Sequence, residues 1–60
     1  MSEPTSEQLA EACREVLPSE DCNDLAAMEF DEALGYSFTL LVEHGVEDPE
    51  GYLRDKDILV

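Results

Sequence analysis

The sequence predicts an all-α protein, a small bundle of three to four short helices around a central helix at about residues 31–44. Apolar residues recur at steps of three and four along the chain, which places them on one side of a helix. Helix-capping residues, prolines and a glycine divide the chain at intervals that suit short helices. The sequence holds no strand-like alternation, internal repeat or low-complexity tract. We expect one domain over residues 5–60, preceded by a flexible tail at residues 1–4.

The first helix is expected to begin at a capping box. In this motif the Thr5 side chain accepts a hydrogen bond from the backbone of Gln8, and the Gln8 side chain accepts one from the backbone of Thr5. The apolar stripe of this helix consists of Leu9, Ala12, Cys13, Val16 and Leu17. Because proline disfavours helical geometry in the residue before it, Pro18 predicts that the helix ends at Leu17.

Residues 19–28 allow three interpretations, one of which is that the next helix begins here without a break. Ser19 can cap a short second helix that has acidic residues in its first turn and turns Leu25 and Met28 inward. The same residues can instead form a loop, with Asp24 capping a later helix start. The sequence leaves this choice open.

The main helix is expected to run from Asp31 to His44. Gly45 suits the left-handed position that follows a helix end, and Val46 would fold back on the last turn, as in a Schellman motif. A histidine in the last turn interacts favourably with the helix dipole, so His44 needs no ligand to explain its position.

The last helix has a strong start signal. Asp48 is a suitable N-cap and Pro49 suits the first helical position, so we expect a helix from Pro49 to about Lys56. Tyr52 and Leu53 would face inward. Residues 57–60 either pack their apolar side chains back on the helix or hang free.

The charge balance limits the classes of partner. Sixteen Asp and Glu residues against three Lys and Arg give a net charge of −13. Such a chain repels nucleic acid and anionic lipid, so we expect neither direct nucleic-acid binding nor membrane binding, and basic proteins or cations are the favoured partners. Many of the acids stand at expected helix N-termini, where the helix dipole stabilises them. A plain solvated surface is therefore the simplest interpretation of the charge.

The length and the cysteine content bound the cellular setting. Sixty residues form at most one small domain of marginal stability. We find no signal peptide pattern, no apolar run near the ~20 residues that a membrane span needs, and too few cysteines for a disulfide framework. We therefore expect a cytoplasmic protein with reduced thiols.

The residues that could carry chemistry are few. Cys13, Cys22 and His44 are candidate zinc ligands, but their spacing matches no zinc motif. Cys13 lies on the expected core stripe, where a free cysteine behaves as a small hydrophobe. No catalytic signature surrounds these residues or Ser37. We expect no metal, no cofactor and no catalysis.

The central helix carries an unusually wide apolar arc. Steps of 100° from Phe30 spread apolar residues over about two-thirds of the circumference, against little more than ~100° on an ordinary surface helix. On one interpretation the other helices cover most of this arc. On the other, a second face meets another chain. The core residues would then be Phe30, Leu34, Phe38 and Leu41, and the partner-binding residues would be Gly35, Tyr36, Thr39, Leu40 and Glu43.

Gly35 favours the second face. A glycine inside a helix costs about 1 kcal/mol relative to alanine, and Gly35 with Thr39 leaves a shallow strip that another backbone can approach. We therefore expect a small acidic helical interaction module, without catalysis, that associates with another protein or with itself as a homodimer. The alternative is an acidic mimic or antagonist that occupies a basic nucleic-acid-binding surface. The module requires an exposed apolar patch, whereas the mimic requires a continuous acidic stripe.

Overall fold

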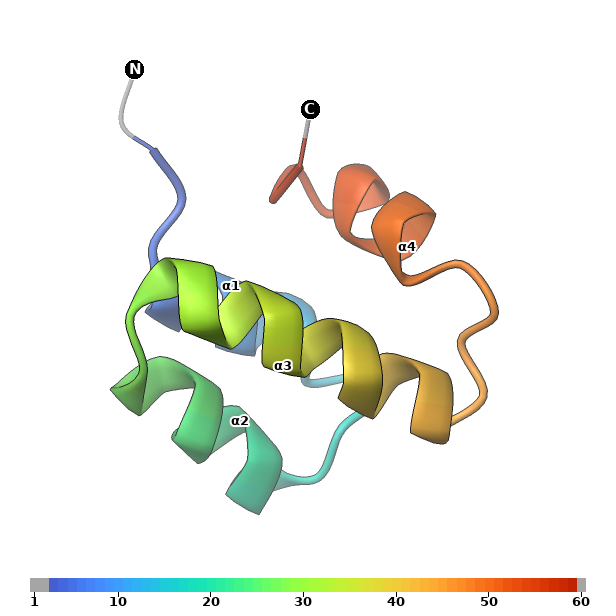
Figure 1. Ribbon diagram of the computed structural model, residues 1–60, viewed down its shortest axis with the longest axis horizontal. Helices are drawn as coiled ribbons and strands as arrows, with labels where there is room; N and C mark the ends of the chain where they lie inside the picture. The colour runs from blue at the N-terminus through green and yellow to red at the C-terminus, as the bar shows by residue number, and fades with distance from the viewer. Residues whose placement is uncertain (1–2, 60) are drawn as a thin grey trace.

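Figure 1 shows the computed structural model of the chain, which describes residues 3–59. The helices in these residues are α1 (Ser6–Ala12), α2 (Ser19–Ala27), α3 (Phe30–Glu43) and α4 (Pro49–Asp55). The long helix α3 contacts the other three, with α1 behind it, α2 below it and α4 above it in this view. The predicted all-α bundle around a central helix is confirmed. Residues 1 and 2 of the expected tail at residues 1–4 lie outside the described residues, and so does Val60.

Helix α1 begins at the predicted capping box. The backbone N–H of Gln8 donates to Thr5 Oγ1 at 3.2 Å, and the backbone N–H of Thr5 donates to Gln8 Oε1 at 2.9 Å. A second contact holds this end of the helix, because the Ser6 hydroxyl donates to the carbonyl of Ala26 at 3.2 Å. The start of α1 is therefore tied to the end of α2.

The end of α1 differs from the prediction. The helix stops at Ala12 rather than at Leu17, and the chain continues through turns. The Tyr52 hydroxyl donates to the Ala12 carbonyl oxygen at 2.6 Å, the oxygen to which Val16 N–H would donate in a continuing helix. The Val16 N–H donates instead to the carbonyl of Cys13 at 3.1 Å. At the end of α1, the Ala12 carbonyl therefore accepts its hydrogen bond from a side chain of α4 and not from the Val16 N–H.

Residues 19–27 form a helix, which settles the choice that the sequence left open. Ser19 is its first helical residue and not its cap, since Pro18 takes the N-cap position without a side-chain hydrogen bond. Asp24 stands within the helix. Leu25 is fully buried as expected, whereas Met28 is only partly buried.

Helix α3 ends in the predicted Schellman motif. Val46 N–H donates to the carbonyl of Leu41 at 2.8 Å, and Gly45 N–H donates to the carbonyl of Val42 at 3.1 Å. Gly45 has φ 93°, in the left-handed region that glycine adopts without a steric cost. Both ends of the helix lie one residue before the predicted ones.

Helix α4 starts as predicted and ends in a second Schellman motif that the sequence analysis missed. The Asp48 side chain accepts from Gly51 N–H at 3.1 Å, with Pro49 in the first turn. At the other end, Ile58 N–H donates to the carbonyl of Leu53 at 2.9 Å, and Asp57 takes the left-handed position with φ 63°. Ile58 is 8% exposed, so the chain packs back after α4.

The core receives one fully buried leucine from each helix. These residues are Leu9, Leu25, Leu41 and Leu53. Of the described helices, none is long and apolar enough to cross a membrane. The core is therefore formed where the four helices meet, and it fixes which side of α3 remains open.

The rotation of α3 differs from one of the two sequence interpretations. The buried side of α3 consists of Ala33, Ser37, Leu40 and Leu41. Phe30, Leu34 and Phe38, which were expected in the core, are only partly buried. Small side chains such as Ala33 allow neighbouring helices to approach closely, and the bulkier residues then flank the contact.

Candidate protein-interaction face

One side of α3 is open to solvent along most of its length. In Figure 1 no other helix of the described chain lies in front of it. This side carries the exposed residues Gly35, Tyr36, Thr39 and Val42 and the half-buried Leu34 and Phe38, which together we call the outer face. Tyr36 is 39% exposed and Val42 57%, and these two are the large apolar residues that the structure exposes among residues 3–59.

The outer face is uncharged in a molecule that is strongly charged elsewhere. The segment from Ala33 to Val42 contains no ionisable acid or base other than the Tyr36 phenol, although the whole chain carries 16 acids. Acidic residues stand at both ends of the segment, with the exposed Asp31 and Glu32 at one end and the exposed Glu43 at the other. The outer face is thus an apolar and neutral strip with negative charge at each end.

Gly35 lies on this strip without a packing reason inside the molecule. A Cβ atom added at Gly35 would meet nothing within 4 Å. Its backbone is ordinary helix, so its conformation does not require glycine. A glycine in an exposed helix interior lowers stability by about 1 kcal/mol relative to alanine. The shallow site at Gly35 therefore costs stability and serves no internal contact.

The predicted partner-binding residues do not all lie on this surface. Gly35, Tyr36, Thr39 and Glu43 are exposed, but Leu40 is 7% exposed and belongs to the core. The placement of Leu40 on a second face was therefore wrong, because α3 is rotated so that this residue points inward. The other half of the outer face was missed.

Leu34, Phe38 and Val42 form the part of the outer face that sequence reasoning missed, since it assigned Leu34 and Phe38 to the core and Val42 to neither face. These residues follow one another at steps of four and so form a continuous apolar ridge along the helix, which is a sequence signal for a contact surface. The same spacing describes a buried stripe equally well. Only the position of the neighbouring helices distinguishes the two cases.

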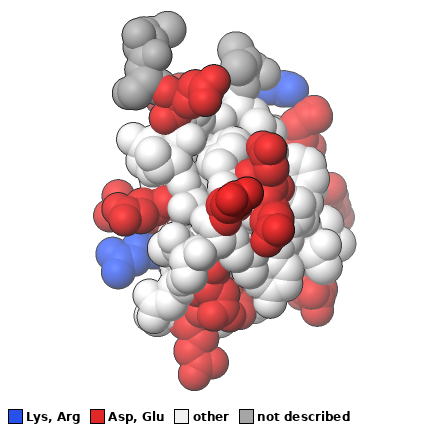
Figure 2. All heavy atoms as spheres, turned by 60° about the vertical axis from the view of Figure 1, so that its left-hand side comes forward, with Lys and Arg blue, Asp and Glu red and all other residues white. Residues whose placement is uncertain are grey.

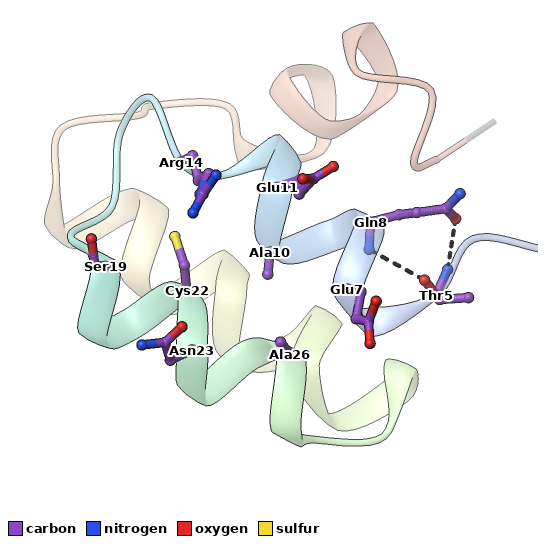
Figure 3. Close-up of a pocket in the computed structure, with 10 residues that line it drawn as sticks. All are labelled: Thr5, Glu7, Gln8, Ala10, Glu11, Arg14, Ser19, Cys22, Asn23 and Ala26. Carbon is purple, nitrogen blue, oxygen red and sulfur yellow. Dashed lines mark hydrogen bonds between the residues drawn. The ribbon is translucent and has the colours of Figure 1, made fainter.

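A groove between α1 and α2 is the other concave feature of interest, and Figure 3 shows it from the side opposite the outer face. Its volume is about 470 Å³, and it is open to solvent. The Cys22 side chain rises from α2 toward Arg14, while Glu7 and Glu11 come from α1. These residues offer scattered charges around a thiol and no evident catalytic pair.

The chemistry of the two cysteines favours an inert role. Both are free and buried. Burial raises the pKa of the Cys13 thiol from 9.0 to about 11, and the nearby Cys22 adds to the rise. Burial also raises the pKa of Cys22, with Arg14 opposing the change. Because the thiolate is the reactive form, neither side chain is activated at neutral pH.

The remaining polar residues near α3 are accounted for by local structure. The buried Ser37 hydroxyl donates to the carbonyl of Leu34 at 2.7 Å. The ring of His44 bonds through Nδ1 to the carbonyl of Leu40 at 2.9 Å, which places the proton on Nδ1 because a carbonyl only accepts. Within residues 3–59, no three His, Cys, Asp or Glu side chains form a group suited to a metal ion.

The acidic side chains are spread over the molecule. On the face in Figure 2 they form separate groups with uncharged surface between them, and Lys and Arg lie toward the edges. Two of the cations are engaged by acids away from α3, in the pairs Arg54–Glu50 and Lys56–Glu15, each at 3.2 Å. Neither of these pairs within residues 3–59 involves the acids that border the outer face.

Comparison of the chain with protein-family models, with curated proteins and with solved structures found no match.

Proposed function

We infer that this protein is a small acidic interaction module, without catalytic activity, that binds another protein through the outer face of α3. The observation that carries this proposal is the combination of exposed Val42 and Tyr36 with an unpacked Gly35 on one uncharged strip. Neither feature stabilises the isolated chain, because apolar side chains are left in water and a glycine inside a helix lowers helix stability. A partner helix could pack on the apolar side chains and approach the backbone at the glycine.

The location that accompanies this proposal is the cytoplasm. Buried thiols such as those of Cys13 and Cys22 stay reduced in that compartment. The charge fits as well, since a net charge of −13 keeps an exposed apolar strip from causing general aggregation.

The test is a capture experiment with three matched baits from cells that make the protein. Wild type is compared with Val42→Lys, which places a charge on the outer face, and with Asn23→Lys, which places the same charge in the groove of Figure 3. Both positions are exposed and helical, so both variants should fold. We expect one or more proteins to be captured by wild type and by Asn23→Lys and to be lost with Val42→Lys.

Two results would contradict the proposal. If all three baits capture the same proteins, the outer face makes no specific contact. If both lysine variants lose them equally, the contact depends on net charge and not on α3. Circular dichroism of each bait verifies that the helices are retained.

A further inference from the structure

The chemistry of the outer face of α3 restricts the kind of partner that can bind there. The inference below rests on the function proposed above. The partner's contact surface must be apolar in the middle, because the segment from Ala33 to Val42 offers no charge to pair with. It can also come close to the α3 backbone at Gly35, where an added Cβ would meet no atom of the molecule within 4 Å. A helix laid along α3 meets both requirements, since helices pack side by side at axis separations of ~8–10 Å that depend on the side chains between them.

The charges at the two ends of the outer face decide between a second copy and a different protein. In a symmetric antiparallel pair of α3 helices, Asp31 and Glu32 of one copy would approach Glu43 of the other. In a parallel pair, each acid would approach the same acidic residue of the second molecule. Both arrangements place like charges together in molecules that each carry a net charge of −13.

A partner with positive charge at both ends of its apolar stretch turns these repulsions into attractions. The distance along α3 from Asp31 to Glu43 is about 18 Å, at ~1.5 Å per residue. The partner therefore needs Lys or Arg residues roughly three turns apart on one side of a helix. The overall negative field of this protein would further speed the encounter with such a helix.

We propose that the outer face of α3 binds a basic amphipathic helix of another protein, with the apolar side of that helix packed on Phe38 and Val42 across Gly35 and with its basic ends at Asp31, Glu32 and Glu43. Recognition is divided between the two features. The apolar strip and Gly35 set the position of the bound helix, and the terminal acids select positive partners over negative ones.

The experiment uses the full chain and a synthetic helical peptide of about 18 residues, long enough to span the outer face at ~1.5 Å per residue. The peptide has a Leu/Ala seam and Lys or Arg at both ends. A matched peptide carries Glu at the basic positions, and a scrambled peptide keeps the composition without the seam. Binding is measured by fluorescence anisotropy at low and high NaCl.

We expect the basic seamed peptide to bind and the acidic and scrambled peptides to bind at least about tenfold more weakly. Affinity should fall as salt rises, because the end contacts are screened. The key variant is Gly35→Leu, which fills the open space with a good helix former and should fold at least as well as wild type. Gly35→Leu should lower the affinity for the basic seamed peptide at least about tenfold, whereas Asn23→Lys should change that affinity far less.

The proposal is overturned if the scrambled peptide binds as well as the seamed one, or if Gly35→Leu leaves the affinity unchanged. Sedimentation equilibrium of the protein alone separates this failure from that of the proposed function. A dimer that strengthens with salt and is lost in Gly35→Leu would keep the outer face as an interface and replace the basic helix with a second copy. A protein that is monomeric, that binds no seamed peptide and whose captured proteins are unaffected by Val42→Lys would overturn both proposals.

Discussion

Tyr52 joins two helices that are distant in the sequence. Its ring is partly buried against the core, and its hydroxyl reaches the carbonyl of Ala12, 40 residues earlier. Lys56 lies over the same ring, with its Nζ 5.7 Å from the ring centroid, and also pairs with Glu15. The contact between α4 and the end of α1 therefore depends strongly on one side chain.

Replacing Tyr52 by phenylalanine should isolate the value of that hydrogen bond. The Ala12 carbonyl would lose its side-chain donor while the aromatic packing is retained, so we expect the free energy of unfolding to fall by about 1 kcal/mol. Urea denaturation measures the change. As a control, Tyr36→Phe removes an exposed hydroxyl of α3 and should leave stability nearly unchanged, and equal losses in the two variants would contradict the role of Tyr52.

Asp57 is the one non-glycine residue in the left-handed region among the described residues. It also places a negative charge just after a helix C-terminus, where the dipole disfavours it. We expect Asp57→Gly to raise the free energy of unfolding by about 0.5–1 kcal/mol, and Asp57→Ala to lower it. Asp57→Asn separates the two causes, because asparagine tolerates this conformation and carries no charge. A gain in Asp57→Ala would contradict the backbone argument.

The Cys13 thiol makes stability depend on alkaline pH. Its pKa is about 11 in the folded protein against 9.0 ordinarily, so the folded state holds the proton more tightly than the unfolded state. The resulting stabilisation is complete below pH 9.0, is lost as the pH rises toward about 11, and is on the order of 2 kcal/mol. We expect the stability difference between wild type and Cys13→Ala to shrink by that order over this range in urea titrations. A constant difference would show that the thiol titrates alike in both states.

At the scale of elements, the helix ends divide into those that local sequence determines and those that it does not. The Thr5 capping box, the Gly45 turn and the Asp48–Pro49 start were predictable because each involves only neighbouring residues. The end of α1 was not, because Tyr52 reaches it from α4. The turn at Asp57 was missed because its residue is not the glycine that usually marks such a position.

The side of α3 that faces the core could not be predicted from the sequence, for a different reason. Its apolar residues occupy most of the circumference, so their pattern does not define a single inward side. Sequence reasoning weighted large residues such as Phe38 as core and neglected small ones. In the structure Ala33 and Ser37 have no exposed surface, because the small residues stand where α3 is packed most fully. Four of the five predicted interface residues were nonetheless exposed.

The two helical glycines offer a matched test of this element-level account. Gly35 has open space beside it, whereas a Cβ at Gly51 would collide with the Asp48 carboxylate that caps α4. We expect Gly35→Ala to raise the free energy of unfolding by up to about 1 kcal/mol, and Gly51→Ala to raise it less or to lower it, since displacing a cap costs about 1 kcal/mol. Thermal unfolding of the two variants side by side makes the comparison. Equal gains would contradict the assigned cap.

At the scale of the whole molecule, charge and apolar surface occupy different places. The net charge of −13 comes from acids on other parts of the chain, while the segment of α3 from Ala33 to Val42 contains no ionisable group other than the Tyr36 phenol. Small domains bury a limited share of their apolar surface, and a 60-residue chain has little stability to spare. Keeping Gly35 and Val42 on an open helix is therefore consistent with selection for binding rather than for stability alone.

The measurement that tests this account most directly is an NMR titration of the labelled full chain with the basic seamed peptide. We predict that amide shifts concentrate on the outer face of α3 and its acidic ends, from Asp31 to Glu43, and that Gly35→Leu suppresses them. Acidic groups elsewhere, including Glu7 and Glu20, should shift little. Shifts spread evenly over all the acidic residues, and unchanged in Gly35→Leu, would show that the peptide responds only to net charge and that α3 is not the binding surface.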